Sequence, residues 1–142
     1  MSVQSYASLP LDHSLLELAR SARENAYAPY SKFRVGAALV THDGRRFSGC
    51  NVENASYGLC LCAERTALSS AVAAGCKTGD FQAMAVIGDT AEPISPCGAC
   101  RQVMAELCDG DMPVLLANLQ GDLQETTVGA LLPGWFQLPI AR

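Results

Sequence analysis

The sequence predicts an α/β domain in which one mixed sheet lies between helices, and three observations support this fold class. Segments of strand length alternate with segments of helix length along most of the chain. The first two strand segments flank an Asp43-Gly44 turn, which is typical of a β-hairpin, whereas a helix precedes each of the next two strands. No linker, repeat or low-complexity tract interrupts the 142 residues, so we expect a single domain over residues 1–142.

The first expected helix spans residues 12 to about 26, after an irregular start at residues 1–10. Asp12 or Ser14 is suited to cap this helix, the latter together with Glu17 in a capping box. Apolar residues at helical spacing form the stripe that should face the core, namely Leu15, Leu18, Ala19 and Ala22.

The remaining elements begin with the hairpin, whose strands are expected at residues 33–40 and 46–52. Two helices follow at residues 62–74, which Gly75 closes, and at residues 97–108, and both are expected to be buried. Three more strands and a short last helix are expected at residues 81–87, 114–118, 123–126 and 127–132.

Composition and charge exclude several classes of partner. Hydrophobic residues make up 49% of the chain and charged residues 17%, so we expect some apolar surface to be buried between subunits. The net charge is −4 and no run of Lys or Arg occurs, which argues against nucleic acid as a partner. No apolar run approaches the ~18–20 residues of a membrane span, so no membrane partner is expected.

The cysteine content favours a reducing compartment. Seven cysteines without a recognisable signal peptide argue against a disulfide scaffold, and we expect a cytoplasmic protein with metal-bound or buried thiols. Four of the cysteines are expected to fill the core, namely Cys50, Cys60, Cys76 and Cys108.

The most specific motif consists of the other three cysteines and a glutamate. Cys62 precedes Glu64 by two residues, and Cys97 and Cys100 lie in a Pro-Cys-x-x-Cys segment. This is the three-cysteine form of the pattern found in zinc-dependent deaminases. Three thiolates can hold Zn²⁺ and leave the fourth position for water, while Glu64 remains free to move protons.

The ligands are expected at the starts of two helices, whose positive ends stabilise thiolates. Cys97 and Cys100 are three residues apart and share a helix face, so they can converge with Cys62 on one ion. Three thiolates give the site a formal charge of −1, which should make a bound water a weaker acid. We expect Arg65 to hydrogen-bond the thiolates and restore this acidity, and Arg101 is a further nearby cation.

Two alternatives involve the cysteines alone. A closed structural zinc site would take Cys60, Cys50 or a histidine as its fourth ligand, but such sites usually contain two Cys-x-x-Cys pairs and only one is present. A thioredoxin-like redox role for Cys97 and Cys100 would leave Glu64 unexplained.

Six segments carry a resemblance to a known family: APYSKF at 28–33, VGAA at 35–38, GCNVENASY at 49–57, CAERTA at 62–67, SPCGACRQ at 95–102 and LLPG at 131–134. Together they resemble the small homotetrameric zinc-dependent cytidine deaminases. The resemblance implies a three-layer α/β/α sandwich with a five-stranded mixed sheet and one Zn²⁺ per subunit. It also implies hydrolysis of cytidine and 2′-deoxycytidine to the uridines and ammonia, a reaction of pyrimidine salvage.

The same resemblance assigns substrate contacts to individual residues. Asn51 and Glu53 should bind the ribose, chiefly its 3′-hydroxyl. Phe33 should pack against the pyrimidine, although plain core packing is an alternative, and the Ala63 backbone should contact the amide edge of the base. Glu64 should serve as general base and then general acid.

Two aromatic residues should complete the substrate site across subunit boundaries. By the resemblance, Phe136 enters the site of a neighbouring subunit and Tyr57 is a subunit-interface contact. The alternative for Phe136 is packing against its own chain. Leu61 and Trp135 depart from the family pattern at the rim of the site.

Other substrates and a non-catalytic role remain open on the residues alone. The substrate alternatives are blasticidin S, a free base, a nucleotide or tRNA adenosine, but the segment from Asn51 to Asn54 favours a plain ribose. A zinc module that only binds a partner protein would need four protein ligands on the metal.

Overall fold

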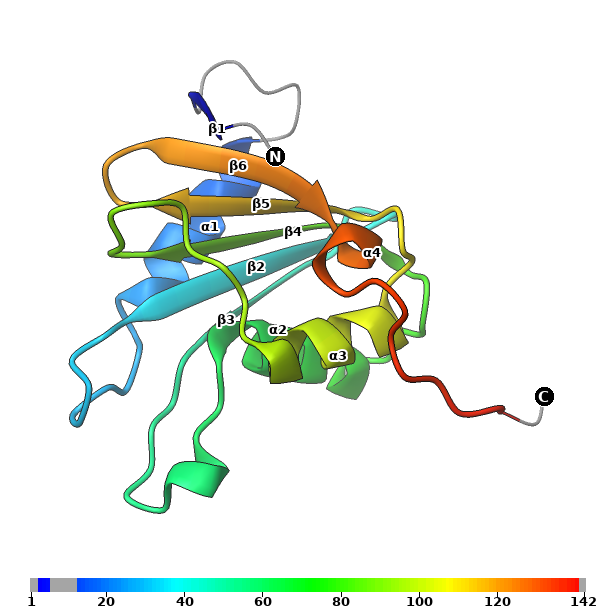
Figure 1. Cartoon of the computed structure of the whole chain (residues 1–142), viewed down its shortest axis with the longest axis horizontal. Helices are drawn as coiled ribbons and strands as arrows, with labels where there is room; N and C mark the ends of the chain where they lie inside the picture. The colour runs from blue at the N-terminus through cyan, green and yellow to red at the C-terminus, as the bar shows by residue number, and fades with distance from the viewer. Residues whose placement is uncertain (1–2, 6–12, 141–142) are drawn as a thin grey trace.

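The computed structural model describes residues 3–5 and 13–140 and contains one mixed sheet of six strands in the order β1-β6-β5-β4-β2-β3 (Figure 1). The two central strands β4 and β5 pair in parallel, and the other neighbours pair antiparallel. The strands are β1 (Val3–Ser5), β2 (Val35–Thr41), β3 (Arg46–Cys50), β4 (Phe81–Gly88), β5 (Pro113–Asn118) and β6 (Asp122–Thr127).

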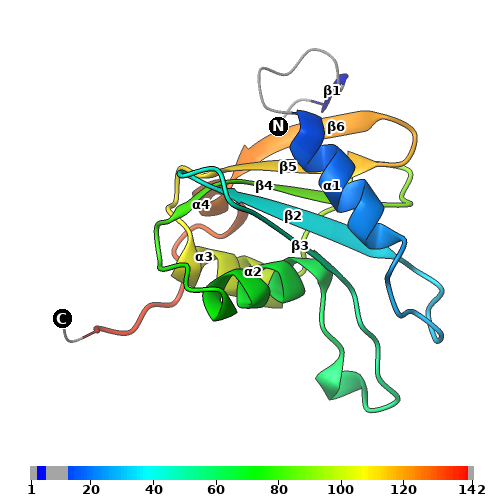
Figure 2. The same ribbon diagram turned by 180° about the vertical axis from the view of Figure 1, so that it is seen from behind.

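Helices cover both faces of this sheet, so the three-layer α/β/α prediction is confirmed (Figures 1 and 2). Helix α1 packs on one face, where Leu15, Leu16 and Ala19 meet apolar side chains of β2, β4, β5 and β6. Helices α2 and α3 pack on the other face over a second cluster that includes Leu68 and Met104. The helices are α1 (His13–Arg23), α2 (Ala63–Ala73), α3 (Gly98–Leu107), the short α4 (Val128–Leu131) and the 3-10 helix η2 (Tyr57–Leu59).

The five expected strands are all present, and a sixth, β1, extends the sheet at its β6 edge. Val3 lies opposite Gln124 in this antiparallel pair. Residues 3–5 were expected to be irregular, because three residues carry too little pattern to predict a strand. They form one because β6 offers unpaired backbone groups at the sheet edge.

Two details of α1 differ from the prediction. The helix ends at Arg23 rather than near residue 26, and Leu16 is buried where Leu18 was expected, Leu18 being only partly buried. A broad apolar face contains more candidate residues than can point directly into the core, and packing decides among them. The proposed cap at Asp12 lies outside the described residues, and the alternative cap at Ser14 is wrong because Ser14 lies inside the helix.

Two glycines allow the helices to approach the hairpin closely. A Cβ atom at Gly36 would lie 1.9 Å from Ala19 O of α1, and one at Gly49 would lie 2.4 Å from Ala67 N of α2. A side chain at either position would therefore push a helix away from the sheet. The close packing of α2 on β3 fixes where the first residues of α2 lie.

Candidate active site

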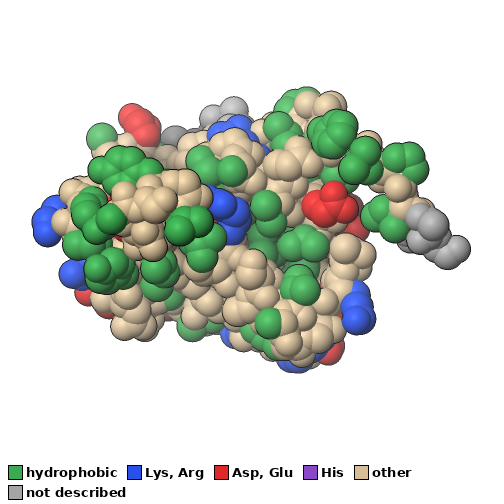
Figure 3. All heavy atoms as spheres, turned by 90° about the horizontal axis from the view of Figure 1, so that it is seen from below, with side chains coloured by type: hydrophobic (Ala, Val, Ile, Leu, Met, Phe, Trp, Pro, Cys, Tyr) green, Lys and Arg blue, Asp and Glu red, His purple; other side chains and the backbone are tan. Residues whose placement is uncertain are grey.

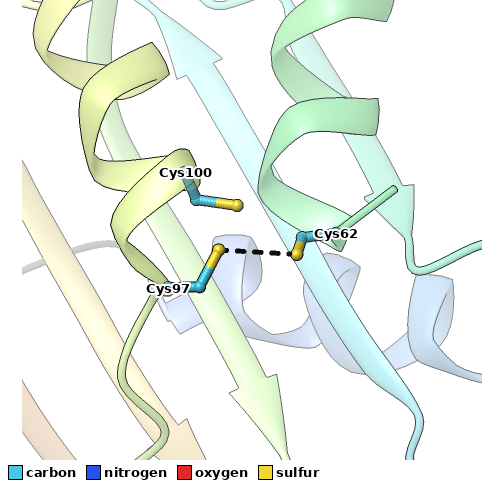
Figure 4. Close-up of side chains that lie close together, drawn as sticks. All are labelled: Cys62, Cys97 and Cys100. Carbon is cyan, nitrogen blue, oxygen red and sulfur yellow. Dashed lines mark hydrogen bonds between the residues drawn. The ribbon is translucent and has the colours of Figure 1, made fainter. Parts of the chain in front are cut away.

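Three cysteine sulfurs converge where α2 and α3 begin (Figure 4). Cys62 is the N-cap residue of α2 and Cys97 is the N-cap residue of α3, while Cys100 lies in the first turn of α3. The three Sγ atoms lie within 4.8 Å of one another, and those of Cys62 and Cys97 are 3.7 Å apart. The predicted convergence of two helix starts on one point is confirmed.

The donor set and its spacing fit zinc. Two sulfurs bound about 2.3 Å from one tetrahedral ion stand about 3.8 Å apart, close to the Cys62–Cys97 separation of 3.7 Å. Within the described ranges, no other cysteine, histidine or acidic residue joins this cluster. The sulfur of Cys60, considered above as a fourth ligand, instead accepts a hydrogen bond from Asn54 N at 3.3 Å.

The guanidinium of Arg65 lies against the sulfur cluster, as expected. Its Nη2 donates to Cys62 Sγ at 3.4 Å. Hydrogen bonds from the Cys100 thiol and from Arg65 lower the pKa of the Cys62 thiol to about 5. Arg65 Nε is buried and has no hydrogen-bond partner among residues 3–5 and 13–140. An anionic sulfur beside the guanidinium therefore offsets the cost of burying its charge.

Glu64 is the one buried carboxylate beside the cluster in the described part of the chain. Only 4% of Glu64 is exposed, and burial together with the negative charge of Cys62 raises its pKa to about 7. A carboxyl group with such a pKa can both accept and donate a proton near neutral pH.

A cavity of about 190 Å³ opens beside the sulfurs and Glu64. Its walls combine residues from the hairpin, the start of α2 and the loop before α3: Phe33, Val35, Asn51, Cys62, Ala63, Glu64, Ile94, Ser95 and Cys97. Six of these were expected site residues, whereas Val35, Ile94 and Ser95 were missed. Ile94 and Val35 are ordinary apolar residues, and nothing in the sequence distinguishes them from core residues.

Asn51 reaches this cavity while holding the chain that carries Phe33. Its Oδ1 accepts from Val35 N, and its Nδ2 donates to Phe33 O, both at 2.8 Å. The second Nδ2 hydrogen and one Oδ1 lone pair carry no bond to a described residue. Asn51 therefore fixes the aromatic wall and still has one donor hydrogen and one acceptor lone pair for a ligand.

Glu53 lies beside the cavity rather than in its wall and binds the same segment. Its Oε1 accepts from Tyr30 N at 3.0 Å and Ser31 N at 3.1 Å, and its Oε2 accepts a short hydrogen bond from Ser31 Oγ. The bond from Ser31 Oγ, followed by the backbone bonds, lowers the pKa of Glu53. Ser31 Oγ in turn accepts from Phe33 N at 3.0 Å, so one hydroxyl links Glu53 to Phe33.

The two expected interface aromatics lie on the surface, away from this chain's cavity. Tyr57 is 75% exposed in η2, where its ring meets Tyr30 at 6.3 Å between centroids, and Phe136 is 68% exposed. Exposed apolar side chains gather over the η2 loop and along the C-terminal segment (Figure 3). Gln102 Nε2 holds that segment through Phe136 O at 2.9 Å.

The other cysteines divide into two groups. Cys76 and Cys108 are buried, as expected for core residues, and burial raises the pKa of Cys108 to about 12. The core prediction is wrong for Cys50 and Cys60, which are only partly buried: Cys50 is the last residue of β3, and Cys60 directly follows η2.

Arg101 has a different role from the one its sequence position suggested. Its guanidinium donates to backbone and hydroxyl oxygens of the loop before α3 and of Leu131. Arg101 was considered only as a cation near Cys100, and the sequence carries no signal for these long-range acceptors.

Comparisons with known proteins agree with this geometry. The family model described as the cytidine and deoxycytidylate deaminase zinc-binding region matches residues 10–116. A cytidine deaminase from Sporosarcina psychrophila is 57% identical over 122 residues, which cover 86% of this chain and 88% of that protein. A cytidine deaminase from Halalkalibacterium halodurans is 60% identical over 122 residues, which cover 86% of this chain and 91% of that protein.

Solved structures agree with the fold. The crystal structure of a cytidine deaminase from Burkholderia pseudomallei superposes with a TM-score of 0.87 at 63% sequence identity, covering 89% of this chain and 99% of that chain. A cytidine deaminase from Mycobacterium tuberculosis superposes with a TM-score of 0.73 at 38% identity, covering 88% of this chain and 96% of that chain. None of the described helices is long and apolar enough to cross a bilayer.

Proposed function

This chain belongs to the zinc-dependent cytidine deaminase family, and from that premise we propose that its cavity hydrolyses cytidine and 2′-deoxycytidine to the uridines and ammonia. One observation carries the proposal: a buried Glu64 stands beside three convergent thiols in a cavity walled by Phe33. This arrangement joins a metal site, a proton carrier and an aromatic wall, which hydrolytic deamination of a flat base requires.

The three cysteines would hold one Zn²⁺ per subunit, and no organic cofactor is required. When bound, the metal supplies Lewis-acid chemistry that lowers the pKa of a water and makes it a nucleophile near neutral pH. Arg65 supports this chemistry, because its bond to Cys62 Sγ reduces the electron donation of that thiolate to the metal.

Glu64 carries the protons in this proposal. It accepts a proton from the attacking water and passes it to N3 of the pyrimidine, which makes C4 more electrophilic. The water oxygen forms a bond to C4. Glu64 then takes the second proton from the new C4 hydroxyl and delivers it to the amino group, so that the C4–N bond breaks, ammonia leaves and a carbonyl remains at C4. A pKa of about 7 suits both steps, because one carboxyl group must be base and then acid.

The hydrogen-bonding groups that remain free at the rim of the cavity suit a ribose. The free Nδ2 hydrogen of Asn51 can donate to a sugar hydroxyl, and Glu53 Oε2 can accept from one. The negative charge of Glu53 also disfavours a substrate phosphate, so a nucleoside fits better than a nucleotide. Phe33 and the Ala63 backbone would contact the base itself.

The assembly we propose is a homotetramer in which Phe136 and Tyr57 reach a neighbouring subunit. Support comes from their exposure, because large apolar side chains at 68% and 75% exposure are costly unless covered. A net charge of −4 disfavours nucleic acid as a partner. All seven cysteines are unpaired, which favours the cytoplasm as the compartment.

One assay tests the proposed function. Purified protein is mixed with cytidine, 2′-deoxycytidine, cytosine, dCMP or blasticidin S, the ultraviolet absorbance is followed, and zinc is measured on the same sample. We expect about one zinc per chain and turnover of the two nucleosides well above that of the others. Stoichiometric zinc without any turnover would favour a non-catalytic zinc module, and preferential turnover of blasticidin S or dCMP would reassign the substrate.

A further inference from the structure

Arg101 makes three hydrogen bonds around the metal ligands, and none of the three is to a sulfur. Its Nε donates to Pro96 O at 2.8 Å, its Nη2 to Ser95 Oγ at 2.6 Å and its Nη1 to Leu131 O at 2.8 Å. In this respect it differs from Arg65, which donates to Cys62 Sγ. Arg101 therefore acts on the chain that carries the ligands rather than on the charge of the sulfurs.

The three sulfurs differ in how their positions are fixed. Cys100 is buried inside the first turn of α3, so the helix itself fixes its Sγ. Cys97 is the N-cap residue, with φ −69° and ψ 166° and an exposed side chain, so its Sγ follows the path of the preceding loop. Zinc coordination tolerates ligand displacements of only about 0.2 Å, so this loop needs a further restraint.

Residue 101 supplies that restraint from both sides of Cys97. The side chain binds the carbonyl of Pro96, which belongs to the peptide unit that enters Cys97. The backbone N–H of Arg101 donates to Cys97 O at 3.0 Å, in the peptide unit that leaves it. With both flanking peptide planes held, the direction of the Cys97 Cα–Cβ bond is fixed before any metal arrives.

The same guanidinium reaches the cavity wall and the end of the fold. Ser95, which lines the cavity, is held through its hydroxyl, and the carbonyl of Leu131 connects the site to the end of α4. A planar fork with five donors can satisfy three acceptors at once, whereas a lysine ammonium at this position would reach fewer of them.

We infer that Arg101 is a positioning residue that preorganises the Cys97 thiol for zinc and aligns Ser95 in the cavity wall. The inference rests on the proposed zinc site. It adds to that site a residue, Arg101, that contacts neither the metal nor the substrate. Partners that orient metal ligands typically change metal affinity by about 10–100-fold when removed.

The test compares Arg101→Gln and Arg101→Lys with the wild-type protein. Zinc affinity is measured by competition with a chromogenic chelator, and the Co²⁺-substituted proteins are compared by their visible absorption, which reports the coordination geometry. We expect Arg101→Gln to lose about 10–100-fold in zinc affinity with altered cobalt bands. Arg101→Lys should also remain weaker than wild type, because it keeps the charge but not the fork.

Arg45→Gln is the matched control, because its guanidinium pairs with Asp43 at 3.2 Å in the exposed hairpin turn. This variant should keep the wild-type zinc affinity and cobalt spectrum. Wild-type values for both readouts in Arg101→Lys or Arg101→Gln would overturn the inference, even if the apo variants melt at lower temperature. If the wild-type protein itself held no zinc or showed no turnover, the proposed function would be contradicted instead. The wild-type measurements alone reveal this outcome, so the two failures are distinguishable.

Discussion

At the scale of single residues, Glu64 combines burial with a negative neighbour, and both raise its pKa toward neutrality. The other charged groups of the site are engaged by hydrogen bonds: Arg65 Nη2 donates to the Cys62 sulfur, and Glu53 accepts from the Ser31 hydroxyl and from two backbone amides. Glu64 is therefore the group whose proton can move at the least cost.

Replacing Glu64 with glutamine should separate metal binding from proton transfer. Glu64→Gln keeps the shape of the side chain and leaves the three sulfurs in place, so zinc content should stay near wild type. Turnover of cytidine should fall by about 10⁴-fold or more, because each assisted proton transfer contributes about 10²–10⁴-fold. Glu106→Gln, on the exposed face of α3, serves as the control and should keep full activity. Activity within tenfold of wild type in Glu64→Gln would assign the proton transfers to another group.

Ser31 is a second residue whose effect can be predicted, because its hydroxyl joins Glu53 to Phe33. Ser31→Ala removes the hydroxyl that donates to Glu53 and accepts from Phe33 N, and so loosens the aromatic wall. We expect KM for cytidine to rise about tenfold or more with a much smaller change in kcat. Steady-state kinetics check this, with Ser70→Ala as the control, since Ser70 Oγ bonds only Ala67 O of its own helix. An unchanged KM would show that Ser31 does not position the substrate wall.

At the scale of elements, the metal site depends on how α2 and α3 sit against the sheet. Cys62 and Cys97 are both N-cap residues, so a shift of either helix along or away from the sheet moves a ligand. The close contact of Gly49 with Ala67 sets the height of α2 above β3.

A side chain at Gly49 should therefore weaken both stability and metal binding. In Gly49→Ala the new Cβ would lie 2.4 Å from Ala67 N, and relieving this clash moves α2 outward. We expect a loss of about 1–3 kcal/mol in stability, measured by urea unfolding, and a lower zinc affinity. Gly110→Ala is the control, because a Cβ there has no atom within 4 Å. If both variants bind zinc equally well, the height of α2 does not control the ligand geometry.

At the scale of the whole molecule, the most exposed large apolar side chains of the described residues lie in the η2 loop and the C-terminal segment (Figure 3). Neither Tyr57 nor Phe136 lines the cavity of its own chain. The proposed tetramer would bring such residues to the site of a neighbour, so activity would depend on residues from two chains.

Mixing two variants that we expect to be inactive on their own tests this dependence. Glu64→Ala lacks the proposed proton carrier, and Phe136→Ala lacks the proposed contribution to a neighbour. In a mixed oligomer, some cavities would combine an intact Glu64 from one chain with an intact Phe136 from the other. We expect measurable cytidine turnover after the variants are unfolded and refolded together, above the sum of the two variants refolded separately. Native mass spectrometry would verify mixed assemblies, and their inactivity would contradict a shared site.

The sequence by itself determined the order of most elements, the hairpin turn, the zinc ligands as a set and Glu64 beside them. Each of these depends on short-range pattern: apolar periodicity, an Asp-Gly turn, or cysteines and a glutamate at fixed spacing. Only the tertiary structure decided that β1 joins the sheet, that Asn51 and Ser31 hold Phe33, and that Arg101 binds the carbonyl of Pro96. These are contacts in which backbone groups of other segments are the partners. Every residue has a backbone carbonyl and all but proline have an N–H, so no residue type in the sequence marks which of these groups will be used.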